Sequence, residues 1–180
     1  IGNSLAERMQ HHGWLESYVQ GTMASKELVF RNHGFAGDKV NNRPRNNGFP
    51  SADAYLEISK ADVILAFWGY NESFDNSPDS FRADLAKWVD ETNSKKYNGE
   101  VAPRLVLLSP IAHENLGQAN LPDGSANNER LAKYTEATRQ VANEKGIEFV
   151  DLFSLSQELY ESSKKPLTIN GIHLTSEGNK

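Results

Sequence analysis

The feature that most constrains the fold is the alternation of short apolar runs with helical patterns. Each run is of strand length and rich in Val, Ile, Leu or Phe, and their apolarity is continuous rather than alternating. Strands of that kind are buried on both faces, as in a parallel sheet with helices on either side. The runs cover residues 28–30, 63–68, 105–108 and 147–152. The sequence therefore predicts a doubly wound α/β domain.

The helical patterns lie between and before these runs. Ser77 is expected to cap one helix, with Pro78 at its first position, and Gly146 to end another. The expected helices cover residues 5–18, 52–59, 78–93 and 127–145. A chain of 180 residues with no repeat or linker fits a single domain over residues 1–180.

Both ends of the sequence are abrupt. Ile1–Ser4 has the pattern of a strand end that runs into a turn, and Thr175–Gly178 that of a helix start. We therefore expect a domain truncated at both ends and of marginal stability by itself, which is compatible with its being part of a larger multidomain chain.

Composition excludes several classes of function. The net charge of −5 argues against a nucleic-acid partner, which needs a basic face. No run of eighteen apolar residues exists that could span a membrane. Without cysteine there are no disulfides and no cysteine nucleophiles or metal sites, and the compartment stays open. The histidine spacings match no standard zinc pattern, so we expect no metal.

Polar segments follow the apolar runs, at the strand ends where an α/β site forms. They supply a serine, flexible backbone positions, a side-chain amide and a histidine, which together suit acyl transfer. The segments are residues 2–4 (Gly-Asn-Ser), 32–38 (Asn-His-Gly-Phe-Ala-Gly-Asp), 69–72 (Gly-Tyr-Asn-Glu) and 170–173 (Asn-Gly-Ile-His).

In this order, and across nearly the whole chain, the segments resemble the four blocks of the SGNH (GDSL) serine hydrolases. The resemblance implies Ser4 as nucleophile, His173 as base, and the Gly37 N–H and the Asn71 amide as oxyanion donors. It also implies a flavodoxin-like three-layer α/β/α sandwich and an esterase or lipase that needs no cofactor.

The sequence departs from the family pattern at three positions. Asn3 and Glu72 replace aspartates that support the site, whereas Asn170 replaces the acid of the catalytic triad. An acid there fixes the tautomer of the imidazole and stabilises the imidazolium, while an amide can do only the first. Either a Ser-His dyad operates, or another acid serves, for which Asp151 at the end of the last strand is the candidate.

Four further residues are candidates for substrate binding. His33 and His113 follow strand ends, Tyr70 could stack on a sugar ring, and Arg43 belongs to the polar run 41–47, which suits hydroxyl-rich or carboxylated ligands. The run is equally compatible with a solvated loop. For Ser4, the alternative to nucleophilic catalysis is a capping box with Glu7.

The function predicted from these residues is hydrolysis of small acyl esters, above all acetyl groups on a carbohydrate. The alternative is a non-catalytic carbohydrate-binding or interaction module on the same scaffold, which Asn170 favours. A nucleotide or flavin binder is disfavoured, because the chain has no phosphate-binding loop with Gly-x-Gly-x-x-Gly spacing.

Overall fold

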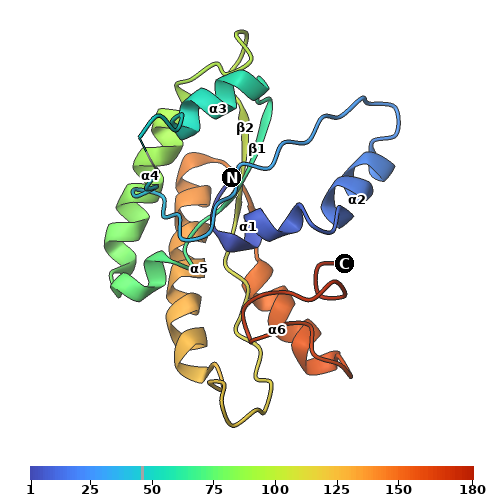
Figure 1. The fold of residues 1–180 in the computed structure, drawn as a ribbon. Coiled ribbons are helices and arrows are strands. Elements are labelled where there is room, and N and C mark those ends of the chain that lie inside the picture. Colours follow the sequence, from blue (N-terminus) through green and yellow to red (C-terminus); the bar gives the residue numbers. More distant parts are fainter. Residues whose placement is uncertain (46) are drawn as a thin grey trace.

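The structure is a computed structural model that describes residues 1–45 and 47–180, so Asn46 of the polar run lies outside the described residues. Its elements alternate helices and strands along the chain (Figure 1). They are α1 (Ser4–Met9), α2 (Trp14–Thr22), α3 (Ala52–Ser59), β1 (Val63–Phe67), the 3₁₀ turn η1 (Glu72–Asp75), α4 (Pro78–Asn93), β2 (Arg104–Leu108), α5 (Ser125–Lys145), β3 (Glu148–Val150) and α6 (Leu152–Ser162).

The strands form a parallel sheet in the order β1-β2-β3, which confirms the predicted sheet. Val63 to Phe67 pair in register with Arg104 to Leu108, and residues 106–108 pair with 148–150. The sheet continues beyond β1, because Gly2 forms parallel bridges to both Phe67 and Gly34. The chain start therefore lies between β1 and the segment around Gly34, as an inner strand of a doubly wound sheet would.

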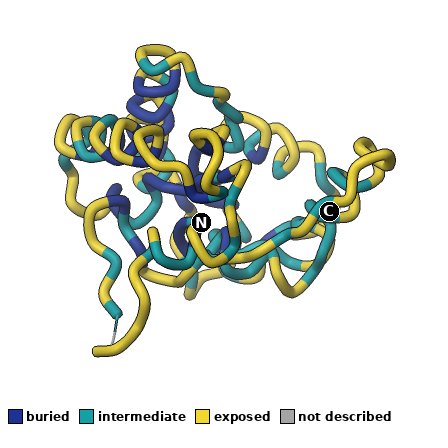
Figure 2. Tube along the Cα trace, turned by 90° about the horizontal axis from the view of Figure 1, so that it is seen from above, coloured by how far each residue is buried: buried dark blue, intermediate teal, exposed yellow. Residues whose placement is uncertain are grey.

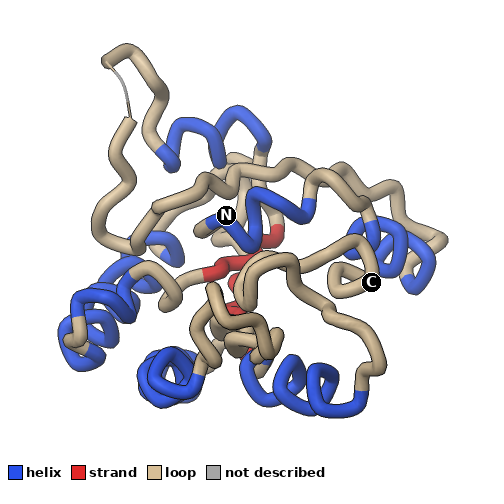
Figure 3. Tube along the Cα trace, turned by 60° about the horizontal axis from the view of Figure 1, so that its bottom comes forward, coloured by secondary structure: helices blue, strands red, loops and turns tan. Residues whose placement is uncertain are grey.

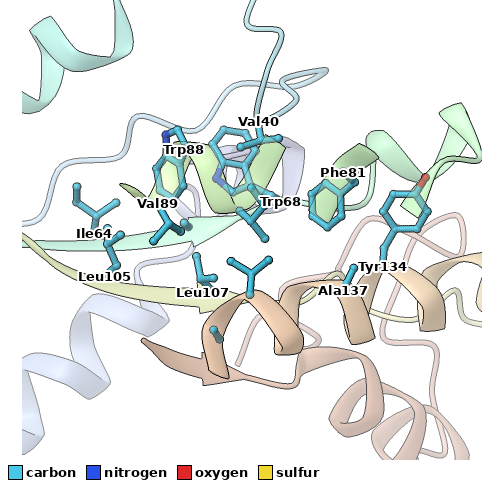
Figure 4. Packing of buried hydrophobic residues seen from close by; sticks show 14 of the residues in the cluster. Val40, Ile64, Trp68, Phe81, Trp88, Val89, Leu105, Leu107, Tyr134 and Ala137 are labelled. Atoms are coloured by element: carbon cyan, nitrogen blue, oxygen red, sulfur yellow. The ribbon is translucent and has the colours of Figure 1, made fainter. Parts of the chain in front are cut away.

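One face of the sheet is fully buried and the other only in part, although the continuous apolar strands predict burial on both. Residues 64, 66, 68, 105 and 107 face α4 and α5 and form the larger core with Leu85, Val89 and Val141 (Figure 4). The opposite face is thinner: Phe67 and Leu108 pack there on Ala6 of α1, with Leu65 and Val106 only partly buried. Strands thus lie at the centre with helices around them (Figure 3).

Several predicted elements need correction. Gly13, in a left-handed conformation with φ 65°, divides the expected helix 5–18 into α1 and α2. Residues 28–30 form no strand; Val29 is 70% exposed, so this short run lacks a second buried face. β3 ends at Val150, and α6, which the sequence did not predict, begins at Leu152. The helices at 52–59 and 78–93 are confirmed.

The ends of α5 and the N-cap of α4 can also be compared with the sequence predictions. α5 starts at Ser125, slightly before the predicted boundary, and ends at Gly146 as expected. Ser77 lies at the N-cap of α4, but its hydroxyl donates to Ser80 Oγ rather than accepting from a backbone N–H.

Buried chain concentrates in the middle of the molecule, and the connecting loops are mostly exposed (Figure 2). Within residues 1–45 and 47–180, no helix combines the length and apolarity needed to cross a bilayer. The same residues contain no cluster of three or more His, Asp or Glu side chains arranged to hold a metal ion.

Candidate active site

A sharp turn from strand into helix presents Ser4 at the edge of the sheet. Phe67 N donates to Ile1 O at 3.0 Å and Asn3 N donates to Phe67 O at 3.2 Å, so the chain runs beside β1 up to Asn3. Gly2 has φ 134°, and a Cβ there would lie 2.3 Å from Phe67 O. Only glycine fits, because this turn needs both positive φ and close backbone approach.

Asn3 caps α1, and this leaves Ser4 without a capping role. Asn3 Oδ1 accepts from Leu5 N at 3.0 Å, while Glu7 Oε2 accepts from Ala36 N at 2.8 Å in another loop. The predicted capping box of Ser4 and Glu7 is therefore wrong, because the cap lies one residue earlier. Within the described part of the chain, the Ser4 hydroxyl makes no hydrogen bond.

The loop over residues 35–38 leaves one backbone donor free. Phe35 N donates to Gly2 O at 2.8 Å, Ala36 N to Glu7, and Asp38 N to Phe35 O at 3.1 Å. Gly37 has φ 85°, and its N–H has no acceptor among the residues described. A preorganised loop with one unpaired N–H is what oxyanion binding requires.

The Asn71 amide is anchored by one of its two N–H groups. Asn71 Nδ2 donates to Asp38 O at 2.8 Å, which leaves its second N–H available. The neighbouring Glu72 is 4% exposed, and its carboxylate accepts from Val40 N and Gly69 N, both at 2.8 Å. Glu72 thus fixes both loops that carry the candidate donors. Burial raises the pKa of Glu72, although the backbone N–H donors oppose this shift.

Asp38 itself is buried and paired. Its carboxylate is 1% exposed and accepts from both terminal nitrogens of Arg45, at 2.7 and 2.6 Å. The Arg45 guanidinium also lies 4.1 Å from the centre of the Phe35 ring. This ion pair ties the segment after Gly37 to the long loop that follows it.

Asn170 organises the turn that carries His173. Asn170 Oδ1 accepts from His173 N at 3.0 Å and from Ile172 N at 3.3 Å, and it lies 3.1 Å from His173 Nδ1. The two backbone donors identify this atom as the amide oxygen rather than the nitrogen. Nδ1 must therefore carry the proton, which leaves Nε2 with a free lone pair to act as a base.

Among the described residues, no carboxylate pairs with His173 to stabilise its charged form. Burial lowers the pKa of His173, and the positive charge of Arg8, one helical turn after Ser4, lowers it further. The candidate acid Asp151 has other partners among the described residues. Its carboxylate pairs with Arg139 at 2.6 Å and caps α6 by accepting from Ser154 N at 2.9 Å. The prediction that Asp151 orients His173 is therefore wrong.

A small pocket is lined by residues of three of the four polar segments, and of the proposed catalytic residues only Ser4 lines it. Ser4 lines it together with Tyr70 after β1, Ile111 after β2, and Ile172, the neighbour of His173. The centre of a water-sized sphere can move within about 20 Å³ of it, so it holds about one water molecule. No hydrogen bond joins Ser4 Oγ to His173 Nε2 in residues 1–45 and 47–180, and such contacts commonly tighten only when substrate binds.

The other predicted binding residues lie outside this pocket. His33 and Arg43 line a separate groove that shares no residue with the pocket. His33 Nε2 lies 3.2 Å from Ser59 Oγ, and Arg43 Cζ lies 5.2 Å from the centre of the Trp68 ring. His113 is 5% exposed beneath the loop that carries Gly171. The prediction that His113 lines the pocket is wrong, because this loop covers the imidazole.

Sequence reasoning missed several residues of the site. Arg8 could have been found, because its spacing from Ser4 places both on one helix face. Glu114 also follows a strand, β2, but its partners lie more than fifty residues away, and nothing local indicates them.

The whole sequence, residues 1–180, matches the model of the GDSL-like lipase/acylhydrolase family. The chain belongs to that family. The family and the parallel sheet together make it an ester hydrolase of SGNH fold. No curated protein matches the sequence significantly.

Solved structures with the same fold include three of different origin. A point mutant of Axe2, an acetyl-xylooligosaccharide esterase from Geobacillus stearothermophilus, is similar at TM-score 0.70 and 17% identity, covering 99% of this chain and 86% of that one. A lipase/acylhydrolase from Enterococcus faecalis gives 0.68 and 19%, with 99% and 86% covered. BT4096, a gut microbial diltiazem-metabolizing enzyme, gives 0.65 and 17%, with 99% and 43% covered. At these identities the likeness shows the fold alone.

Proposed function

We propose that the chain is a serine esterase that removes small acyl groups, above all acetyl groups on carbohydrates, through an acyl-enzyme on Ser4. One observation carries the proposal: the Ser4 hydroxyl has no hydrogen-bond partner among the described residues and lies in a small pocket at a strand-to-helix turn. The loop beside this turn carries the Gly37 N–H, which is unpaired in the same part of the chain. Family membership makes ester hydrolysis the chemistry to expect.

The residues divide the reaction among them. Ser4 Oγ attacks the ester carbonyl while His173 Nε2 takes the hydroxyl proton and then returns it to the leaving alcohol. The oxyanion accepts from the N–H groups of Ser4 and Gly37 and from the free N–H of Asn71. Water, activated by the same imidazole, then releases the acid. Asn170 holds the tautomer but contributes no charge, so the machinery is a dyad with an orienting amide.

The pocket supports a short acyl group. It holds about one water molecule, which is close to the size of a methyl group. Pro110, Ile111 and Ile172 close it with rigid or branched side chains. This size favours acetyl esters in the proposal.

Tyr70 supports a carbohydrate on the alcohol side. It lines the pocket and packs edge-to-face on Phe74, which is 60% exposed, so the two rings offer an aromatic surface beside the scissile bond. The Axe2 structures are described as acetylxylan or acetyl-xylooligosaccharide esterases, and two are described as catalytic mutants, one of a serine and one of a histidine. Both descriptions agree with the proposal.

Hydrolysis of p-nitrophenyl acetate and butyrate tests it. We expect acetate to be cleaved at least about tenfold faster in kcat/KM, since extra methylenes do not fit. Ser4→Ala should abolish turnover, and Ser25→Ala, at an exposed serine, should leave it unchanged. Turnover that survives in Ser4→Ala would refute the mechanism.

The alternative, a non-catalytic carbohydrate-binding module, is favoured by the amide at Asn170, because the imidazolium lacks a carboxylate. A folded native protein that binds xylo-oligosaccharides but hydrolyses neither ester would support this alternative.

A further inference from the structure

Glu114 is a buried carboxylate that binds the segment preceding the histidine loop. It is 6% exposed and accepts from Leu167 N at 3.0 Å, from Thr168 N at 2.7 Å and from Thr168 Oγ1 at 2.6 Å. Among the residues described, no Lys, Arg or His side chain pairs with it. A buried carboxyl group is costly unless hydrogen bonds satisfy its oxygens, so its donors fix its position.

Thr168 passes this restraint to the turn of the base. Its Oγ1 donates to Glu114 and accepts from Gly171 N at 2.9 Å, within the Asn170–His173 turn. Glu114 N also donates to Gly171 O at 2.8 Å, so Glu114 binds this turn through its backbone as well. Ile169 N donates to His173 O at 2.8 Å, which fixes the far end of the same turn.

The same turn packs closely against His113. A Cβ on Gly171, at φ 90°, would lie 2.3 Å from His113 Nε2. His113 and Glu114, which follow β2, therefore support the turn together. The His113 side chain packs against Gly171, and the Glu114 carboxylate is hydrogen-bonded to the segment that precedes the turn.

We propose that Glu114 and Thr168 are positioning residues for His173: the hydrogen-bond chain from Glu114 through Thr168 to Gly171 sets the height and angle of the imidazole over Ser4. Because Asn170 supplies no charge to hold the imidazole, this hydrogen-bond chain has to define the geometry. The inference rests on the proposed esterase function, since it assigns the residues a role in that reaction.

Variants at Thr168 separate positioning from folding. Thr168→Val keeps the shape of the side chain but removes the hydroxyl, whereas Thr168→Ser keeps the hydroxyl. We expect Thr168→Val to lower kcat for p-nitrophenyl acetate by about 10–100-fold, because a displacement near 1 Å at a catalytic group has this effect. KM should change less than about twofold, and Thr168→Ser should restore most of kcat. Glu114→Gln should act in the same direction, and Glu161→Gln, at an exposed glutamate of α6, should be neutral.

Rates are counted per active site titrated with a fluorophosphonate, so that unfolded protein does not contribute. If Thr168→Val and Glu114→Gln lower the melting temperature but leave kcat per titrated site unchanged, the residues are structural and the proposal is overturned. Should Thr168→Val fail to fold, Glu114→Gln decides by the same criterion.

A second readout is independent of turnover. The ¹⁵N spectrum of His173 reports its tautomer, and we expect the Nδ1–H form to dominate in the native protein and in Thr168→Ser but to lose population in Thr168→Val. A native protein that hydrolyses no ester would refute the proposed function, while the spectra would still test the positioning role. Identical His173 spectra in all variants would overturn it.

Discussion

At the scale of single residues, the account depends on how an amide can replace an acid. Asn170 Oδ1 receives two backbone N–H groups and faces His173 Nδ1, so it selects the tautomer that a triad acid would select. It adds no negative charge, and burial and Arg8 both act against the imidazolium. The site should therefore be slow but active, with a base that stays neutral to lower pH than a free histidine.

Asn170→Asp should raise kcat/KM by at least about tenfold, because exchange of acid and amide at this position costs about 10⁴-fold in a triad. The added carboxylate also stabilises the imidazolium and raises the pKa of His173. Activity requires neutral His173, so the acidic limb of the pH–rate profile should move to higher pH. An unchanged rate and profile would show that position 170 does not act on the imidazole.

Arg8→Gln tests the second influence on the same group. Because the guanidinium lowers the pKa of His173, its removal should raise this pKa, and activity should be lost at a higher pH as the solution is acidified. Arg31→Gln, at an exposed arginine, is the control and should not move the limb. A shift in the opposite direction would contradict the assignment of His173 as the base.

Asn71→Ala should lower kcat by about 10²–10³-fold with little effect on KM, since an oxyanion donor acts mainly in the transition state. Asn143→Ala, on the exposed face of α5, is the matched control. Steady-state kinetics check this, and a variant with normal kcat and a raised KM would refute the oxyanion role.

At the scale of elements, the turn at Gly2 connects the sheet to the nucleophile. Substitution places a Cβ 2.3 Å from Phe67 O at a φ that side chains avoid. The same β1 backbone holds Ile1 and Asn3, so any displacement reaches Ser4 directly.

Gly2→Ala should therefore destabilise the fold by at least about 2 kcal/mol and lower the activity of the protein that remains folded. Gly21→Ala provides the contrast: Gly21 lies in α2 with nothing within 4 Å of its Cβ, so alanine should stabilise by about 0.5–1 kcal/mol. Urea unfolding measures both, and equal midpoints for Gly2→Ala and the native protein would contradict the turn geometry.

At the scale of the whole molecule, the stability resides mainly on one side of the sheet. The core under α4 and α5 contains fully buried side chains such as Leu85 and Leu107, whereas the face under α1 is only partly covered.

Leu85→Ala should cost about 2–5 kcal/mol of unfolding free energy, and Leu155→Ala, at a half-exposed position of α6, less than about 0.5 kcal/mol. Denaturant titration compares the two. Similar losses would show that the face of α6 is covered in solution.

The sequence could predict what depends on local pattern. The continuous apolar strands, the Pro78 helix start and the order of the polar blocks all follow from neighbouring residues, and the structure confirms the parallel sheet and two of the helices in full. Contacts between segments that are distant along the chain could not be predicted from the sequence. The capping of α1 by Asn3, the pairing of Asp151 with Arg139 and the burial of His113 each depend on how the chain folds back.

The central claim, that Ser4 is a nucleophile activated by His173, is tested most directly by labelling with a fluorophosphonate followed by peptide mapping. Such reagents react with serines whose proton a base removes. The account predicts one adduct, located on Ser4, absent from Ser4→Ala and at least about a hundredfold slower in His173→Ala. Folded native protein that takes up no label, or takes it up at another serine, would contradict the account.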